Sequence, residues 1–208
     1  AYDQQPKIAH WDLARFAETL LPLISDDPDT AVAAAHEALD PFMERLDARY
    51  HAGMARKLGL AEARDGDADL ALDLLARMAR QEADFTLTFR RLAELGREPG
   101  AADAAVRELF TDPAEFDAWA ERWRQRLAAE DSDDAERRAA MRAVNPAYTP
   151  RNHRVEQAIE AAFQEGNLRP IDDLLTVLAD PYADHPGYEH LAQPPEPEEV
   201  VRQTFCGT

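Results

Sequence analysis

The acidic residues that are spaced like metal ligands do not complete a metal site. Asp65, Asp67 and Asp69 alternate as in the first half of a calcium-binding loop. In that loop the sixth position needs glycine and the twelfth a bidentate glutamate, whereas this chain has Leu70 and Ala76 there. We therefore interpret the stretch as a loop that leads into a helix, with Asp67 capping the positive end of that helix.

The histidine and serine residues also lack the neighbours that catalysis would need. Asp184, His185 and His190 lie close together in sequence, but no histidine pair is spaced to share a helix face, and we interpret them as solvated loop residues. Serine occurs only as Ser25 and Ser132, both in acidic, turn-like surroundings that disfavour a nucleophile. Neither a Walker pattern nor a G-x-G-x-x-G loop is present. The sequence predicts no catalytic, nucleotide-binding or metal-ligating residue.

The charge and composition of the chain limit its partners, its metal sites and its location. The 208 residues include 41 acidic and 23 basic side chains, a formal net charge of −18. This disfavours nucleic acid and anionic membranes as partners, because phosphate surfaces attract lysine and arginine patches. The single cysteine excludes a disulfide framework and a cysteine-rich zinc site. No apolar run is long enough to span a membrane and no signal peptide is visible, so we expect a cytoplasmic bacterial protein.

The composition predicts an all-α fold, an irregular multi-helix bundle. Ala and Leu, which enter helices at little cost, occur 40 and 22 times, whereas Val and Ile together occur 11 times. We expect a helical domain over residues 1–180 and an extended, proline-rich tail over residues 181–208 that ends near the cysteine. The periodic patterns predict helices over residues 8–24, 30–58 with a break at Pro41, 67–78, 84–95, 112–127, 151–166 and 171–178.

The pattern over Ile8–Ile24 is apolar on most of the helix circumference, with Trp11 and Phe16 among its large side chains. A helix of this kind is normally buried. We therefore expect it to lie against further protein, which is the first hint that the chain is a piece of a longer one.

Three more expectations concern where side chains point. Trp119 and Trp123 lie four residues apart and are expected in a core, since no basic groove accompanies them as it would a base-stacking platform. The charged run over residues 129–138 is expected to be solvated. The helix over residues 151–166 is expected to turn four apolar residues inward: Val155, Ile159, Ala162 and Phe163.

The stretch from Asn145 to His153 is the most distinctive polar segment. Asn145-Pro146 and Arg151-Asn152 flank it, and Asn residues favour turns and helix caps. Arg151 can pair with an acidic group or a helix C-terminus elsewhere. A rigid connector pinned by hydrogen bonds is the favoured interpretation, and a role in positioning a neighbouring domain is the alternative.

Three segments along the chain together form a recognisable pattern. They are Tyr2-x-x-Gln5-Pro6-x-Ile8-x-x-Trp11-Asp12-Leu13-x-Arg15, Asn145-Pro146-x-Tyr148-x-x-Arg151-Asn152, and Phe205-Cys206-Gly207-Thr208. In this order and spacing the chain resembles the selenoprotein O family, also called YdiU. Asp12 is a departure, because the family usually has Asn there, and it places a charge on a helix expected to be buried.

The resemblance implies a protein adenylyltransferase with a protein-kinase-like (pseudokinase) fold, which uses ATP and Mg²⁺ to move AMP to Ser, Thr or Tyr hydroxyls of protein substrates. The family's catalytic residues lie upstream of the first motif, so none is carried over. This chain would be the C-terminal helical portion, inactive and without a cofactor on its own, that buttresses the upstream catalytic domain.

Two further expectations depend on that resemblance. Relatives place a redox-active cysteine or selenocysteine at the position of Cys206 and pair it with a cysteine of the catalytic domain. Without that domain, the apolar helix near Trp11 and Phe16 is expected to drive weak self-association. A free-standing helical protein-interaction module without catalysis is the alternative to the whole account.

Overall fold

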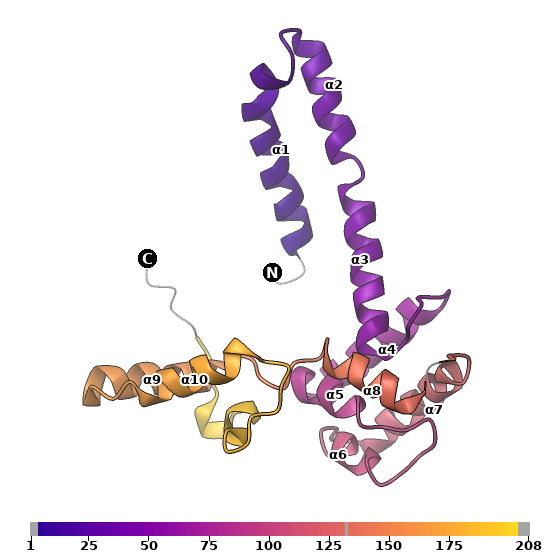
Figure 1. Cartoon of the computed structure of the whole chain (residues 1–208), viewed down its shortest axis with the longest axis vertical. Coiled ribbons are helices and arrows are strands. Elements are labelled where there is room, and N and C mark those ends of the chain that lie inside the picture. Colours follow the sequence, from indigo (N-terminus) through magenta and orange to yellow (C-terminus); the bar gives the residue numbers. More distant parts are fainter. Residues whose placement is uncertain (1–3, 132, 204–208) are drawn as a thin grey trace. The chain divides into compact units, whose positions relative to one another are not determined.

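The computed structural model describes residues 4–131 and 133–203 (Figure 1). Every regular element in these ranges is helical, which confirms the all-α prediction. The helices are α1 (Gln5–Ile24), α2 (Pro28–Leu39), α3 (Phe42–Lys57), α4 (Asp67–Gln81), α5 (Phe85–Leu92), α6 (Asp103–Arg107), α7 (Pro113–Leu127), α8 (Asp134–Arg142), α9 (Asn152–Glu165), α10 (Arg169–Ala179), and the short 3-10 helices η2 (Glu189–Ala192) and η3 (Pro197–Glu199). Within the described ranges, none is both long and apolar enough to cross a membrane.

Contacts divide the chain into two compact units, Ala1–Met54 and Ala55–Thr208. In the first unit α1 and α2 lie side by side (Figure 1). The Asp27 carboxylate caps α2 by accepting from the Thr30 amide at 3.0 Å. The helix ends at Leu39, just before Pro41, and α3 begins after it, which confirms the predicted break.

The first helix is much less covered than its sequence predicts. No residue of α1 is buried, and Ile8, Phe16 and Leu23 are 57%, 59% and 83% exposed. The described residues of this chain therefore do not cover α1, and the expectation that it lies against further protein stays a prediction. The reason is that α2 covers one side of α1, while the apolar residues are spread over most of its circumference.

In the second unit, α4 and α7 pack around two tryptophans. Trp119 and Trp123 are fully buried with stacked rings, their centroids 5.8 Å apart, which confirms the core prediction. Each indole N–H also donates to a backbone carbonyl, Trp119 to Leu70 at 2.9 Å and Trp123 to Leu58 at 2.8 Å. Because α4 begins at Asp67 with Gly66 as its N-cap, the predicted capping position was one residue late.

The prediction that the charged run over residues 129–138 is solvated is right for most of its described residues, which are exposed or half-buried, but wrong for two of them. Glu130 and Arg137 are both buried, and the run contains the start of α8. The Asp133 carboxylate caps α8, and the Arg137 guanidinium donates to the Leu95 carbonyl and lies 5.7 Å from the Trp123 ring centroid. The spacing of charges in the sequence does not show that an aromatic ring and a backbone carbonyl lie next to this guanidinium in the fold.

A second core lies between α9, α10 and the segment after Pro181. Its buried residues include Ala158 of α9, Val177 of α10 and Leu191 of η2. The segment after residue 180 is thus partly helical and packed, where a wholly extended tail was expected. Ile159 and Phe163 are 55% and 90% exposed, so two of the four residues expected to point inward do not, because the Val155–Ala158 side of α9 makes the contact.

Gly59 occupies a position that a side chain should not tolerate. Its φ is +77°, and a Cβ there would lie 2.6 Å from Met141 Sδ, whose side chain is buried. Gly166 also has a positive φ of +65°, but a Cβ there meets nothing within 4 Å. We expect Gly59→Ala to lower the free energy of unfolding by roughly 2–4 kcal/mol, and Gly166→Ala by about 1 kcal/mol. Equal losses in urea denaturation would show that the contact with Met141 is unimportant.

Candidate functional site: two buried polar clusters

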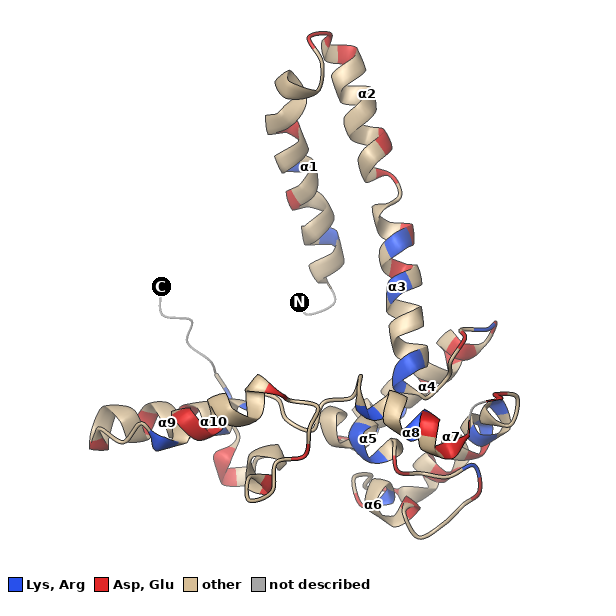
Figure 2. Ribbon diagram, viewed as in Figure 1, with Lys and Arg blue, Asp and Glu red and all other residues tan. Residues whose placement is uncertain are grey.

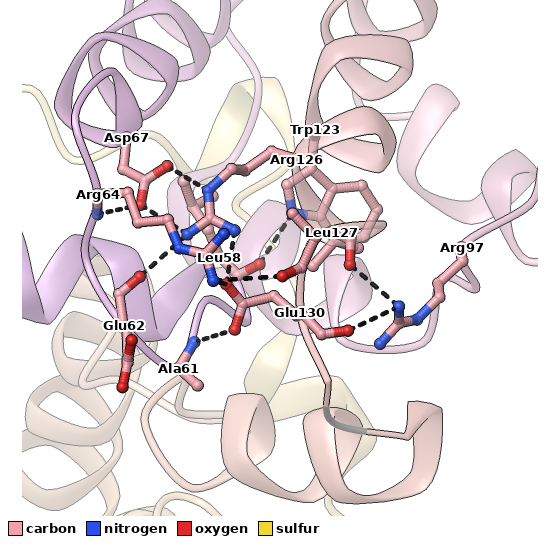
Figure 3. A network of polar contacts seen from close by, with 11 residues as sticks. Leu58, Ala61, Glu62, Arg64, Asp67, Arg97, Trp123, Arg126, Leu127 and Glu130 are labelled. Atoms are coloured by element: carbon pink, nitrogen blue, oxygen red, sulfur yellow. Dashed lines mark hydrogen bonds and ion pairs between the residues drawn. The ribbon is translucent and has the colours of Figure 1, made fainter.

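The first polar cluster is centred on Arg126 of α7, and we call Arg126, Asp67 and Glu130 the Arg126 cluster (Figure 3). Arg126 Nε and Nη2 donate to the two Asp67 carboxylate oxygens at 2.7 and 3.0 Å. Its Nη1 donates to Glu130 Oε1 at 2.5 Å. The side chains of Asp67 and Glu130 are only 5% and 3% exposed, so two buried carboxylates share one guanidinium.

The other hydrogen bonds of the Arg126 cluster hold the loop between α3 and α4. Asp67 Oδ2 accepts from the Arg64 amide at 2.7 Å, and Glu130 Oε2 accepts from the Ala61 amide at 3.1 Å (Figure 3). The hydrogen bonds that Arg126 donates to Asp67 raise the pKa of Arg126, which stays charged at every relevant pH. The cluster therefore positions backbone, and each of its four carboxylate oxygens already accepts a hydrogen bond.

The second cluster lies at the Asn145 motif, and we call Lys57, Asp84, Arg90, Asn145 and Arg151 the Asn145 junction. Asn145 is fully buried and exchanges two hydrogen bonds with Lys57: its Nδ2 donates to the Lys57 carbonyl at 2.9 Å and its Oδ1 accepts from Nζ at 3.1 Å. Partial burial lowers the pKa of Lys57. Arg90 Nη1 donates to the Asn145 carbonyl at 3.2 Å. The interpretation of a connector pinned by hydrogen bonds is confirmed.

Arg151 finds its predicted acidic partner in Asp84. Its Nη1 and Nη2 donate to the two Asp84 oxygens at 2.7 and 3.0 Å, and the side chains are 10% and 18% exposed. Asp84 also caps α5 by accepting from the Leu87 amide at 2.8 Å. One carboxylate thus joins the start of α5 to the start of α9.

This pair should contribute to the pH dependence of stability. Burial alone would raise the pKa of Asp84, but the hydrogen bonds from Arg151 and Leu87 outweigh it and hold that pKa below its ordinary value of 3.8. The stabilisation of the fold by the Asp84–Arg151 pair is then fully present above pH 3.8 and is lost as the pH falls through the folded-state pKa of Asp84.

We expect Asp84→Asn to cost about 1–3 kcal/mol at pH 7 and progressively less as the pH falls from 3.8 through the folded-state pKa of Asp84, because wild type loses the same stabilisation over that range. Denaturant unfolding at pH 7 and at pH 3 measures the cost of the substitution at each pH. Asp184→Asn is the matched control, since Asp184 pairs with Arg90 but is 71% exposed, and its effect should stay small. A constant cost of Asp84→Asn across this range would contradict the assignment.

The other motif residues lie in both units. Gln5 and Pro6 line an apolar groove of about 1120 Å³ in the first unit, together with Leu39, Phe42 and Tyr50. Trp11 is 58% exposed on α1, and Arg15 lies 5.7 Å from its ring centroid.

In the second unit, Pro146 is half-buried within the connector, and Asn152 is the first residue of α9, whose N-cap is Arg151. Asn152 was expected to suit the cap, but the cap is Arg151, so the helix starts one residue earlier than that. Cys206 lies outside the described residues.

Nothing in the described ranges fits a metal ion or a nucleotide phosphate. Across residues 4–131 and 133–203, no three His, Cys, Asp or Glu side chains are grouped as ligands. Helices α7 and α8 carry charges of both signs (Figure 2), and their arginines pair with carboxylates of other elements. Examples are Arg122 with Asp73, Arg124 with Asp103 and Arg142 with Glu94.

Sequence reasoning missed the acidic partners of both clusters. The spacing of Arg126 and Glu130 is that of a helical i, i+4 pair and was visible in the sequence. The pairing of Arg126 with Asp67 and of Arg151 with Asp84 spans 59 and 67 residues, for which the sequence offers no local signal.

Comparison with known proteins gives consistent matches over nearly the whole chain. The model of a family described as “Protein adenylyltransferase SelO” matches residues 1–179. A “Protein nucleotidyltransferase YdiU” from Rhodopseudomonas palustris (strain BisB18) is 56% identical over 208 residues. Proteins with the same description are 53% identical over 209 residues in Bradyrhizobium sp. (strain ORS 278) and 54% over 213 residues in Methylorubrum extorquens (strain PA1).

These alignments cover the chain and the relatives unequally. Each covers 100% of this chain, but only 42%, 42% and 43% of the three relatives. The chain thus spans less than half the length of the curated relatives it matches.

Proposed function

Because the chain belongs to the SelO protein adenylyltransferase family, we propose that it is the helical, non-catalytic portion of a protein adenylyltransferase. The whole protein would have a kinase-like fold, lie in the cytoplasm and transfer AMP from ATP to Ser, Thr or Tyr hydroxyls of protein substrates. ATP and Mg²⁺ would be held by the part of the protein that the relatives have outside this match. The described residues support that division, since their basic groups pair with carboxylates and their carboxylates do not group as ligands.

The observation that carries the proposal is the exposed apolar surface of the first unit. Helix α1 has no buried residue, and its exposed side chains include Ile8, Trp11 and Phe16. The apolar groove of about 1120 Å³ beside it adds to this surface. Exposed apolar surface of this extent is typical of an interface. We propose that the catalytic portion covers it, and that the isolated chain associates weakly with itself through the same surface.

Cys206 would carry redox regulation in the complete enzyme. It is the only cysteine of this chain, so an internal disulfide would need a thiol from the catalytic portion. Oxidation of the two thiols to a disulfide would tether the tail and restrain the enzyme, and reduction would release it. Reductant should then raise the activity of the complete enzyme, and Cys206→Ser should remove that response.

Hydrogen exchange tests whether α1 is covered. The segment of the Rhodopseudomonas palustris relative that aligns with this chain is measured alone and within the complete relative. We expect amides of the segment that aligns with α1 to exchange at least tenfold more slowly in the complete protein. Amides aligned with α7, whose tryptophans are already buried here, serve as the control and should change little. Equal exchange at α1 in both forms would favour a free-standing interaction module.

A further inference from the structure

The last described segment of the chain returns to α9 and is held there by one carboxylate. Glu199, the last residue of η3, accepts a hydrogen bond from Gln157 Nε2 at 2.8 Å. Arg154 Nη1 lies 3.6 Å from the same Glu199 oxygen and donates to Gln157 Oε1 at 2.8 Å. Two side chains of α9, which also contact each other, therefore converge on Glu199.

Local structure prepares Glu199 for this contact. Its second oxygen accepts from the Glu196 amide at 3.0 Å, and the Glu196 side chain accepts from the Glu199 amide, which completes a capping box. The Glu199 amide also donates to the Glu196 carbonyl at 2.9 Å. The Glu196 amide and Gln157 hold the pKa of Glu199 below its ordinary value of 4.5. The side chain is thus charged at neutral pH and already oriented before it meets α9.

The cation that faces Glu199 is Arg154. His153 lies on the same turn of α9 and is buried, with no hydrogen-bond partner for its Nε2. Burial, together with the charges of Arg154 and Arg151, lowers the pKa of His153, although Glu199 acts in the opposite direction. A neutral imidazole at neutral pH leaves Arg154 and Gln157 as the groups that bind the carboxylate.

We propose that Glu199 is a latch that holds the described segment after η2 against α9. With Glu199 bound, the chain is fixed as far as the end of η3. With Glu199 released, the nearest packed residue is Ala192, at the end of η2. Release frees the residues from Gln193 to Glu199, which span about 25 Å at about 3.5 Å per extended residue.

Tryptic cleavage after Arg202 measures the latch in the complete 208-residue chain. Arg202 is exposed and lies three residues after Glu199, and a protease must extend several residues on either side of the bond it cuts. Cleavage then tracks the population of the released state. We expect Gln157→Ala and Glu199→Ala each to speed release of the peptide after Arg202 about two- to fivefold, as for loss of one partly exposed polar contact.

The matched control is Gln164→Ala on the same helix. Gln164 makes the same kind of contact, donating to Glu160 at 3.1 Å, but does not touch the segment after η2. It should leave the cleavage rate unchanged, and the double variant Gln157→Ala/Glu199→Ala should be cleaved no faster than Glu199→Ala, because both substitutions break one contact. Cleavage of both single variants at the wild-type rate would overturn the latch. Equal acceleration by Gln164→Ala would also overturn it, since fraying of α9 would then explain the effect.

Discussion

Arg126→Ala is expected to lower the free energy of unfolding by about 3–5 kcal/mol. The substitution removes the only guanidinium bound to both Asp67 and Glu130 and leaves two carboxylates in a site where their side chains are 5% and 3% exposed. Buried charges without a partner are among the most costly defects in a fold. Urea or guanidinium denaturation measures the loss.

Arg122→Ala is the matched control. Arg122 lies on the same helix and pairs with Asp73 at 2.8 Å, but its side chain is 52% exposed, and the loss should stay within about 1 kcal/mol. The triple variant Arg126→Met/Asp67→Asn/Glu130→Gln removes all three charges and should recover part of the stability lost by Arg126→Ala. Similar losses for Arg126→Ala and Arg122→Ala would show that burial does not govern this cluster.

Asn145→Ala is expected to lower the free energy of unfolding by about 2–4 kcal/mol. It removes one of the two acceptors of the half-buried Lys57 ammonium, which also donates to the Val144 carbonyl, and the donor to the Lys57 carbonyl, in a position that is fully buried. Groups left unpaired in such a place lose both their partner and their water. Chemical denaturation again supplies the measurement.

The control for this substitution is Asn167→Ala. Asn167 also uses its side chain to hold backbone, accepting from the Arg169 amide at 3.1 Å, but it is exposed. Its replacement should cost about 1 kcal/mol or less. If Asn145→Ala cost no more than Asn167→Ala, the Asn145 junction would be a passive turn.

Local signals predicted the helices well, whereas long-range contacts had to come from the structure. The break at Pro41 and the Asp112 cap before Pro113 follow from proline geometry and side-chain capping, which act within a few residues. The short helix α6 and the nine-residue helix α8 were missed, since neither shows enough apolar periodicity.

Burial was harder to predict than helicity, because it depends on what lies across from each face. Arg137 was assigned to solvent but is buried over Trp123, and Phe163 was assigned to a core but is 90% exposed. The sequence predicted that Arg151 pairs with another group but did not identify that group, which in the fold is Asp84. The residue types show which side chains need a polar partner when they are buried. The fold shows which partners they have.

The most direct test of the central claim is transfer of AMP. The 208-residue chain and the complete Rhodopseudomonas palustris relative are each incubated with ATP labelled at the α-phosphate, Mg²⁺ and a mixture of protein substrates. The account predicts protein-bound label that depends on the complete relative, and none above background with the chain alone. Label transferred by the chain alone, or none transferred by the complete relative, would contradict it.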